Sequence, residues 1–275
     1  MIVDSVLIQS ESLSSAKKGI KVQNHNSALR HINTLHLQGL SISTVIENVK
    51  STTISLWAKT IESLPSPLFC FVRKGLQQQL ATASNLRRWG KVTSDTCPLC
   101  KQIQTNKHAL SNCSAPSALH RYKLRHDAVL FILCNWLKSV LLPDSKLYAD
   151  IVGYEPLANV FASFRPDITV VRYKTVHVCE LTVCHETNLT KSRDYKLTKY
   201  ADLNLNLTED FQSFNVKIET VEVSVFGFMS DISDFTKLTT NSILPDSIRS
   251  NIIRNVIGNS YNVYLNRNAE DSAIQ

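Results

Sequence analysis

A short run of cysteine and histidine residues constrains the fold of this chain more than any other feature. Cys97, Cys100, His108 and Cys113 follow the pattern C-x2-C-x7-H-x4-C, in which the first two thiols can turn toward one ion. Three thiolates and one imidazole complete a tetrahedral zinc site and leave no position for a bound water. The sequence therefore predicts a structural Zn2+ knuckle that folds on its metal, because so short a segment has no core of its own. Ordinary buried cysteines beside a chance histidine are the alternative.

The remaining cysteines have no partner at ligand spacing, and we expect them to be small core residues: Cys70, Cys134, Cys179 and Cys184. The total of seven is odd, and the N-terminal residues lack the sections of a secretory signal. We therefore expect reduced thiols in a protein that is not secreted. The longest apolar run, residues 129–142, is interrupted by Asn135 and Lys138 and is shorter than the roughly 20 residues of a spanning helix, so no membrane segment is expected.

Basic residues concentrate around this predicted knuckle. The formal net charge is +7, and the stretch 87–125 sets the single acid Asp95 against a group of basic residues: Arg87, Arg88, Lys91, Lys101, Lys107, Arg121, Lys123 and Arg125. A local excess of this kind favours nucleic acid, because binding releases condensed counterions. We expect DNA, or RNA, as the partner. The candidate contacts are Arg87, Arg88, Lys91, Arg121 and Arg125, and a solvated basic face without a partner is the alternative.

The composition, with 43% hydrophobic and 19% charged residues, predicts one sizeable core with small appendages. We expect a poorly specified, partly helical lead-in over 1–50, a helical linker with a proline turn over 51–95, the knuckle over 96–115, an α/β domain over 118–264 and a tail over 265–275.

Within the α/β domain, the apolar pattern predicts alternating helices and strands. Helices are expected near 118–142, 189–211, 231–238 and 246–257, and strands near 148–154, 167–173, 176–184 and 216–228. This order predicts a mixed sheet flanked by helices.

Two acids fall on adjacent predicted strands. Asp167 opens one strand and Glu180 lies in the middle of the next, so a hairpin turning at Lys174 and Thr175 brings the two acids to the same end of the pair. Carboxylates in that position can hold Mg2+, or Mn2+, against a phosphate. The alternative is an edge-strand acid that is paired with a lysine.

A lysine on the following helix can supply the positive group that phosphate hydrolysis needs. On a helical wheel, Lys196 falls in line with Leu189 and Leu203 and beside Tyr200, on the apolar side, whereas Lys199 falls on the polar side. We expect Lys196 to face the two acids, either in a buried ion pair or as a catalytic group.

The order of these motifs resembles the restriction-like endonuclease of R2-type non-LTR retrotransposons, within the PD-(D/E)XK nuclease superfamily. The resemblance covers roughly residues 51–240. Its signposts are Asn85-Leu86-Arg87-Arg88-Trp89-Gly90, the Cys-Cys-His-Cys knuckle, Arg125-His126-Asp127, Arg165-Pro166-Asp167, Glu180-Leu181-Thr182-Val183 and Lys196-Leu197-Thr198-Lys199-Tyr200. The general superfamily has its lysine two residues after the second acid, where this chain has Thr182. The R2-like branch resembles this chain in placing that lysine on the next helix.

The resemblance implies a PD-(D/E)XK restriction-endonuclease-like mixed sheet, preceded by the helical linker and the knuckle. The implied roles are metal acids for Asp167 and Glu180, the migrated catalytic lysine for Lys196, accessory catalytic positions for Lys199 and Tyr200, and support for His126, Asp127 and Arg165. For His126, which lies on the apolar stripe of the long helix, a satisfied core histidine is the more frequent situation.

The activity implied is an Mg2+-dependent endonuclease that nicks target DNA in the nucleus for retrotransposon integration, in a protein that is otherwise cytoplasmic. The chain has no Tyr-x-Asp-Asp motif, so we expect the reverse transcriptase in a longer parent protein. One alternative is a catalytically inert, nucleic-acid-binding relic or domesticated protein. Another is a resolvase-like nuclease that acts on branched DNA.

Overall fold

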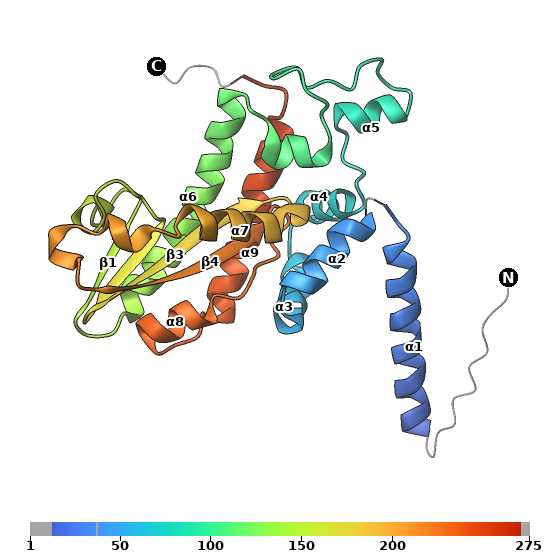
Figure 1. Ribbon diagram of the computed structural model, residues 1–275. Coiled ribbons are helices and arrows are strands. Elements are labelled where there is room, and N and C mark those ends of the chain that lie inside the picture. The colour runs from blue at the N-terminus through green and yellow to red at the C-terminus, as the bar shows by residue number, and fades with distance from the viewer. Residues whose placement is uncertain (1–12, 37, 271–275) are drawn as a thin grey trace.

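The computed structural model describes residues 13–36 and 38–270, and it has a mixed β-sheet flanked by helices (Figure 1). The predicted α/β class with a mixed sheet is confirmed. The first part of the lead-in and residues 271–275 of the tail lie outside the described residues. In the described ranges, no helix combines the length and apolar character needed to span a membrane.

Helices precede the Cys/His segment, and α1 extends away from the rest of the molecule (Figure 1). They are α1 (Leu13–Asn33), α2 (Gln38–Asn48), α3 (Ser51–Glu62), α4 (Ser66–Leu76) and α5 (Ala83–Arg88). The predicted proline turn joins α3 to α4, where Pro65 caps the second helix. Trp57 of α3 stacks on Phe228 at 4.2 Å and donates from Nε1 to the Phe226 carbonyl at 2.7 Å. The linker helices therefore share a core with the segment that follows the last strand.

The sheet has the strand order β1-β2-β3-β4, with β1, β2 and β3 antiparallel and β4 parallel to β3. A parallel neighbour requires a crossover connection, which α7 supplies between β3 and β4. The elements are α6 (Pro116–Val140), β1 (Ser145–Ala149), β2 (Ile168–Arg172), β3 (Thr175–Cys184), α7 (Leu189–Lys199), β4 (Asn215–Ser224), α8 (Ser233–Thr240) and α9 (Asp246–Leu265).

The two faces of the sheet have separate cores. Leu133 of α6 and Ile252 of α9 pack on the face that carries Leu181, whereas Tyr200, just after α7, packs on the face that carries Val178. Because side chains alternate along a strand, Glu180 points to the same face as Val178, toward α7. The sequence predicts that the acids face this helix.

Two element boundaries differ from the prediction. β1 ends at Ala149 instead of residue 154, because Ala149 pairs with Ile168, the first residue of β2. The helix expected to reach residue 211 ends at Lys199, and short 3-10 turns follow it (Leu203–Asn206 and Glu209–Phe211). The stretch after Lys199 is rich in Asp and Asn, whose side chains compete with helical backbone hydrogen bonds.

The turn between β2 and β3 also lies one residue earlier than predicted. Arg172 pairs with Thr175, so Tyr173 and Lys174 form the turn, and Tyr173 has a positive φ of 51°. The observed register places Ile168 opposite Cys179, and it therefore brings the preceding Asp167 alongside Glu180, whereas the predicted turn would have placed Asp167 opposite Thr182.

A glycine at position 173 should stabilise this hairpin. A side chain at positive φ costs about 1 kcal/mol, which glycine avoids, and Tyr173 is 70% exposed, so little packing is lost. We expect Tyr173→Gly to raise the free energy of unfolding by about 0.5–1 kcal/mol in urea denaturation. A decrease would show that the contact of the ring with Arg172, at 4.6 Å, outweighs the backbone effect.

Candidate functional site

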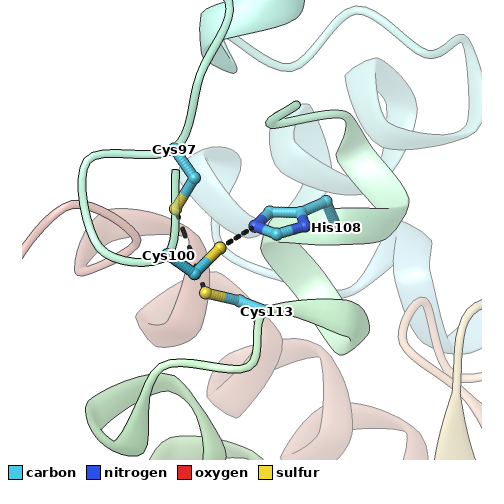
Figure 2. A group of neighbouring side chains, drawn as sticks. All are labelled: Cys97, Cys100, His108 and Cys113. Carbon is cyan, nitrogen blue, oxygen red and sulfur yellow. Dashed lines mark hydrogen bonds between the residues drawn. The ribbon is translucent and has the colours of Figure 1, made fainter. Parts of the chain in front are cut away.

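The four residues of the predicted knuckle lie together (Figure 2). Cys97 and Cys100 lie at the two ends of one tight turn, while His108 begins a π-helical turn (His108–Asn112) and Cys113 follows it. Their ligand atoms all lie within 4.8 Å of one another. These residues could hold a metal ion such as zinc.

Two of the distances between ligand atoms lie close to those of a tetrahedral zinc site. A Zn–S bond of about 2.3 Å gives S···S edges of about 3.8 Å and S···N edges of about 3.6 Å. The Cys97 and Cys113 Sγ atoms lie 3.9 Å apart, and Cys100 Sγ lies 3.3 Å from His108 Nε2. Burial raises the pKa of the Cys113 thiol to about 12 and lowers the pKa of His108. The imidazole is thus neutral, as a metal ligand must be. A metal ion bound between the thiols would stabilise their deprotonated form.

Helix α6 is attached to this cluster by hydrogen bonds. The Tyr122 hydroxyl accepts from the Cys113 N–H at 3.2 Å and donates to the His108 carbonyl at 3.1 Å. The buried Arg125 donates from Nη1 to the Leu110 carbonyl at 2.9 Å, and its guanidinium lies 5.3 Å from the centre of the Tyr122 ring. The Cys/His segment therefore packs against the first half of α6.

This arrangement corrects two predictions from the sequence. Arg125 is only 1% exposed, so it holds the Cys/His segment to α6 and is not available to bind nucleic acid. Cys70 is exposed instead of part of the core, whereas the other three cysteines outside the cluster are buried as expected.

The two predicted metal acids lie side by side. The Asp167 N–H donates to Glu180 Oε1 at 3.0 Å, and the Leu181 N–H donates to Asp167 Oδ2 at 2.8 Å. Asp167 is 9% exposed and Glu180 is fully buried. Each carboxylate is thus oriented by the backbone of the neighbouring strand, and the Leu181 N–H is a contact that the sequence does not reveal.

Lys196, the lysine that the helical wheel predicted to face the acids, does lie next to them. Lys196 Nζ pairs with Glu180 Oε2 and lies 3.7 Å from Asp167 Oδ2. The exposed Lys199 instead extends over the Tyr200 ring, with Nζ 4.6 Å from its centre, and donates to the Tyr200 hydroxyl. Tyr200 in turn donates to the Arg165 carbonyl at 3.2 Å, so it braces the segment that leads into Asp167.

His126 links α6 to the acids. Its Nε2 lies 3.4 Å from Asp167 Oδ1, and its Nδ1 lies 3.1 Å from Asp127 Oδ1. It is therefore not an ordinary core histidine, since both ring nitrogens face carboxylates. Lys123 pairs with Asp127 from the preceding turn of the same helix. Lys123 was not among the predicted site residues, although its spacing of four from Asp127 could have identified it.

The electrostatics of the acids are unequal. Burial raises the pKa of Asp167, but the hydrogen bond and charge of His126 and the charge of Lys196 outweigh it and hold that pKa below its ordinary value. Burial and the charge of Asp167 raise the pKa of Glu180 to about 7. Burial lowers the pKa of Lys196, yet the two acids outweigh that effect and raise it. At neutral pH the cluster thus holds an ionised Asp167 beside a charged lysine.

A cleft of about 390 Å³ is lined in part by Lys123, Asp127, Asp150 and Arg165, while Asp167, Glu180 and Lys196 are not part of its lining. The Asp150 N–H donates to the Asp167 carbonyl at 3.1 Å, which places the cleft beside that residue. The other predicted nucleic-acid contacts lie elsewhere on the surface, where Arg87, Arg88 and Lys91 are exposed and Arg121 is half-buried.

Comparison with known proteins does not identify a family. No protein-family model matches this chain, and a search of curated proteins finds none that matches it.

Loss of the Cys/His cluster should cost stability. We expect one equivalent of zinc by elemental analysis, and loss of that zinc in the Cys97→Ser, Cys100→Ser double variant. Each 1 kcal/mol of lost stability lowers the melting temperature of a domain of this size by roughly 2–4 °C, so loss of the bound metal should lower it by several degrees or more in calorimetry. Cys70→Ser, a change at an exposed cysteine outside the cluster, is the matched control and should keep both the zinc and the melting temperature. Equal melting curves for all the variants would contradict a structural role for the cluster.

Proposed function

We propose that this protein is a metal-dependent endodeoxyribonuclease of the PD-(D/E)XK type. The observation that carries the proposal is the pairing of Asp167 and Glu180 on neighbouring strands with Lys196 in contact with both. Two carboxylates and an ammonium group are the groups that hydrolysis of a phosphodiester requires. Structural ion pairs alone rarely place two acids so close in a buried position, because the acids repel one another.

The order of elements supports this proposal. A helix, three antiparallel strands, a crossover helix and a parallel fourth strand agree with the mixed sheet flanked by helices that the resemblance to restriction-like endonucleases implies. The Cys/His cluster before α6 and the exposed basic residues agree with the R2-type arrangement of a zinc knuckle followed by a nuclease. On this proposal, the target is nuclear DNA and the reverse transcriptase belongs to a longer parent protein.

Asp167 and Glu180 would hold Mg2+ or Mn2+, whose hard character suits carboxylate oxygens. The ion would supply Lewis acidity toward the phosphate and a lowered pKa for a bound water. Lys196 would stabilise the negative charge that develops on the phosphate oxygens, and His126 would keep Asp167 ionised and oriented. Lys199 and Tyr200 would act one step away, by holding the backbone at Arg165.

The nuclease proposal can be tested by nicking of supercoiled plasmid in Mg2+ or Mn2+. We expect Asp167→Asn and Glu180→Gln to abolish nicking, because each removes a charged metal ligand, while DNA binding without divalent metal stays within about twofold. Asp231→Asn is the matched control, since Asp231 is a partly exposed acid that pairs with Lys50 away from the site. It should nick at the wild-type rate.

The same assay separates the rivals. A wild-type protein that binds DNA but nicks neither plasmid nor a four-way junction would favour the inert, nucleic-acid-binding alternative. Cleavage of the junction alone would favour the resolvase-like alternative. Nicking that survives in both acid variants would refute the assignment of the site.

The two lysines should differ in their effect on the rate. Lys196→Ala should lower the single-turnover rate by roughly two to three orders of magnitude, as does removal of one group that stabilises a transition state. Lys199→Ala should lower it less than about tenfold, because the exposed Lys199 contacts Tyr200 and not the acids. The reverse order would show that Lys199 is the catalytic lysine.

A further inference from the structure

One large aromatic side chain lies on the surface of the basic region. Of the three tryptophans, Trp57 and Trp136 are 9% and 7% exposed, whereas Trp89 is 41% exposed. Trp89 follows the last residue of α5 and belongs to none of the hydrophobic clusters of the described residues. Its indole N–H has no acceptor among those residues. The packing of the described chain thus gives no reason for an exposed tryptophan here.

The surroundings of Trp89 favour an anionic partner. Arg88 and Lys91 are exposed on either side of it in the chain, and Lys91 Nζ lies 5.9 Å from the centre of the Trp89 ring. From residue 63 to residue 126 the only acid is Asp95, and it is already paired with Arg87 at 2.7 Å. The positive charge beside the ring is therefore not neutralised by neighbouring acids.

The backbone next to the ring is also open. Gly90 has a positive φ of 69°, and a side chain there would meet no heavy atom within 4 Å. The backbone after Trp89 is therefore uncrowded, and the only cation that lies over the ring within the described residues is the flexible Lys91 side chain.

We propose that Trp89 stacks on a base of an unpaired nucleic-acid strand while Arg88 and Lys91 neutralise the adjacent phosphates. A duplex keeps its base faces inside its own stack, so only an unpaired strand can present a face to the ring. The inference rests on the nucleic-acid-binding part of the proposed function and adds the type of strand. It is independent of whether Asp167 and Glu180 are catalytic.

The test compares strands by fluorescence anisotropy in buffer without divalent metal or chelator. The probes are a labelled thymidine oligodeoxynucleotide, a uridine oligoribonucleotide of the same length and a duplex of that length. Removal of one aromatic side chain that stacks on a base typically lowers the affinity by about fivefold to 150-fold. We expect Trp89→Ala to weaken binding of an unpaired strand by this factor and binding of the duplex by less than about twofold.

Two variants control for indirect effects. Trp89→Phe retains an aromatic face and should restore most of the affinity. Phe131→Ala removes an aromatic side chain that is 49% exposed on α6 and should change no affinity. Intrinsic fluorescence gives a second measurement, because Trp89 is the tryptophan most accessible to acrylamide. A bound strand should protect it from quenching in the wild type and produce no such protection in Trp89→Phe.

The outcomes are distinct. A loss in Trp89→Ala that affects either unpaired strand but spares the duplex supports stacking, and the better-bound probe tells DNA from RNA. An equal loss on duplex and single strands, or no loss at all, overturns it. Failure of the nuclease proposal would appear only in plasmid nicking and would leave these affinities unchanged.

Discussion

The burial of two carboxylates side by side is the constraint on which this structure depends. Asp167 and Glu180 repel each other, and the repulsion strengthens as water is removed from around them. The fold answers with basic side chains from helices on opposite faces of the sheet, His126 on α6 and Lys196 on α7. The hairpin register, the position of α7 and the rotation of α6 are therefore linked. The register sets where the two acids lie, and the two helices must place Lys196 and His126 next to them.

Much of this arrangement could be predicted from local patterns. Alternation along β3 places Glu180 on the face toward α7, and a two-residue turn brings Asp167 to the same end of the strand pair. Because the turn lies one residue earlier than predicted, the register differs by two residues, and Asp167 lies alongside Glu180 instead of Thr182. The choice of Lys196 was less secure. The helical wheel that selected Lys196 assumed a helix continuing to Leu203 and beyond. Because α7 ends at Lys199, only the part of the wheel from Leu189 to Lys199 corresponds to the structure.

Other features could not be predicted, because they depend on partners that are distant in sequence or on burial. Arg125 belongs to a run of basic residues that a charge count treats alike, but its partners are a carbonyl at Leu110 and the hydroxyl of Ser260 on α9. Cys70 has an apolar neighbourhood in sequence and still lies on the outer side of α4. Composition reports how many charges a region has, and only packing decides which of them face water.

Helix α6 carries contacts to both parts of the protein within little more than one turn. Tyr122 and Arg125 hold the Cys/His segment, and His126 holds Asp167. Each residue advances a helix by 100°, so inserting or deleting one residue between Tyr122 and His126 would rotate one set of contacts away from its partners. The Cys/His segment and the α/β region are for this reason not exchangeable units. A chain beginning at α6 would leave the buried guanidinium of Arg125 without the Leu110 carbonyl that accepts its hydrogen bond.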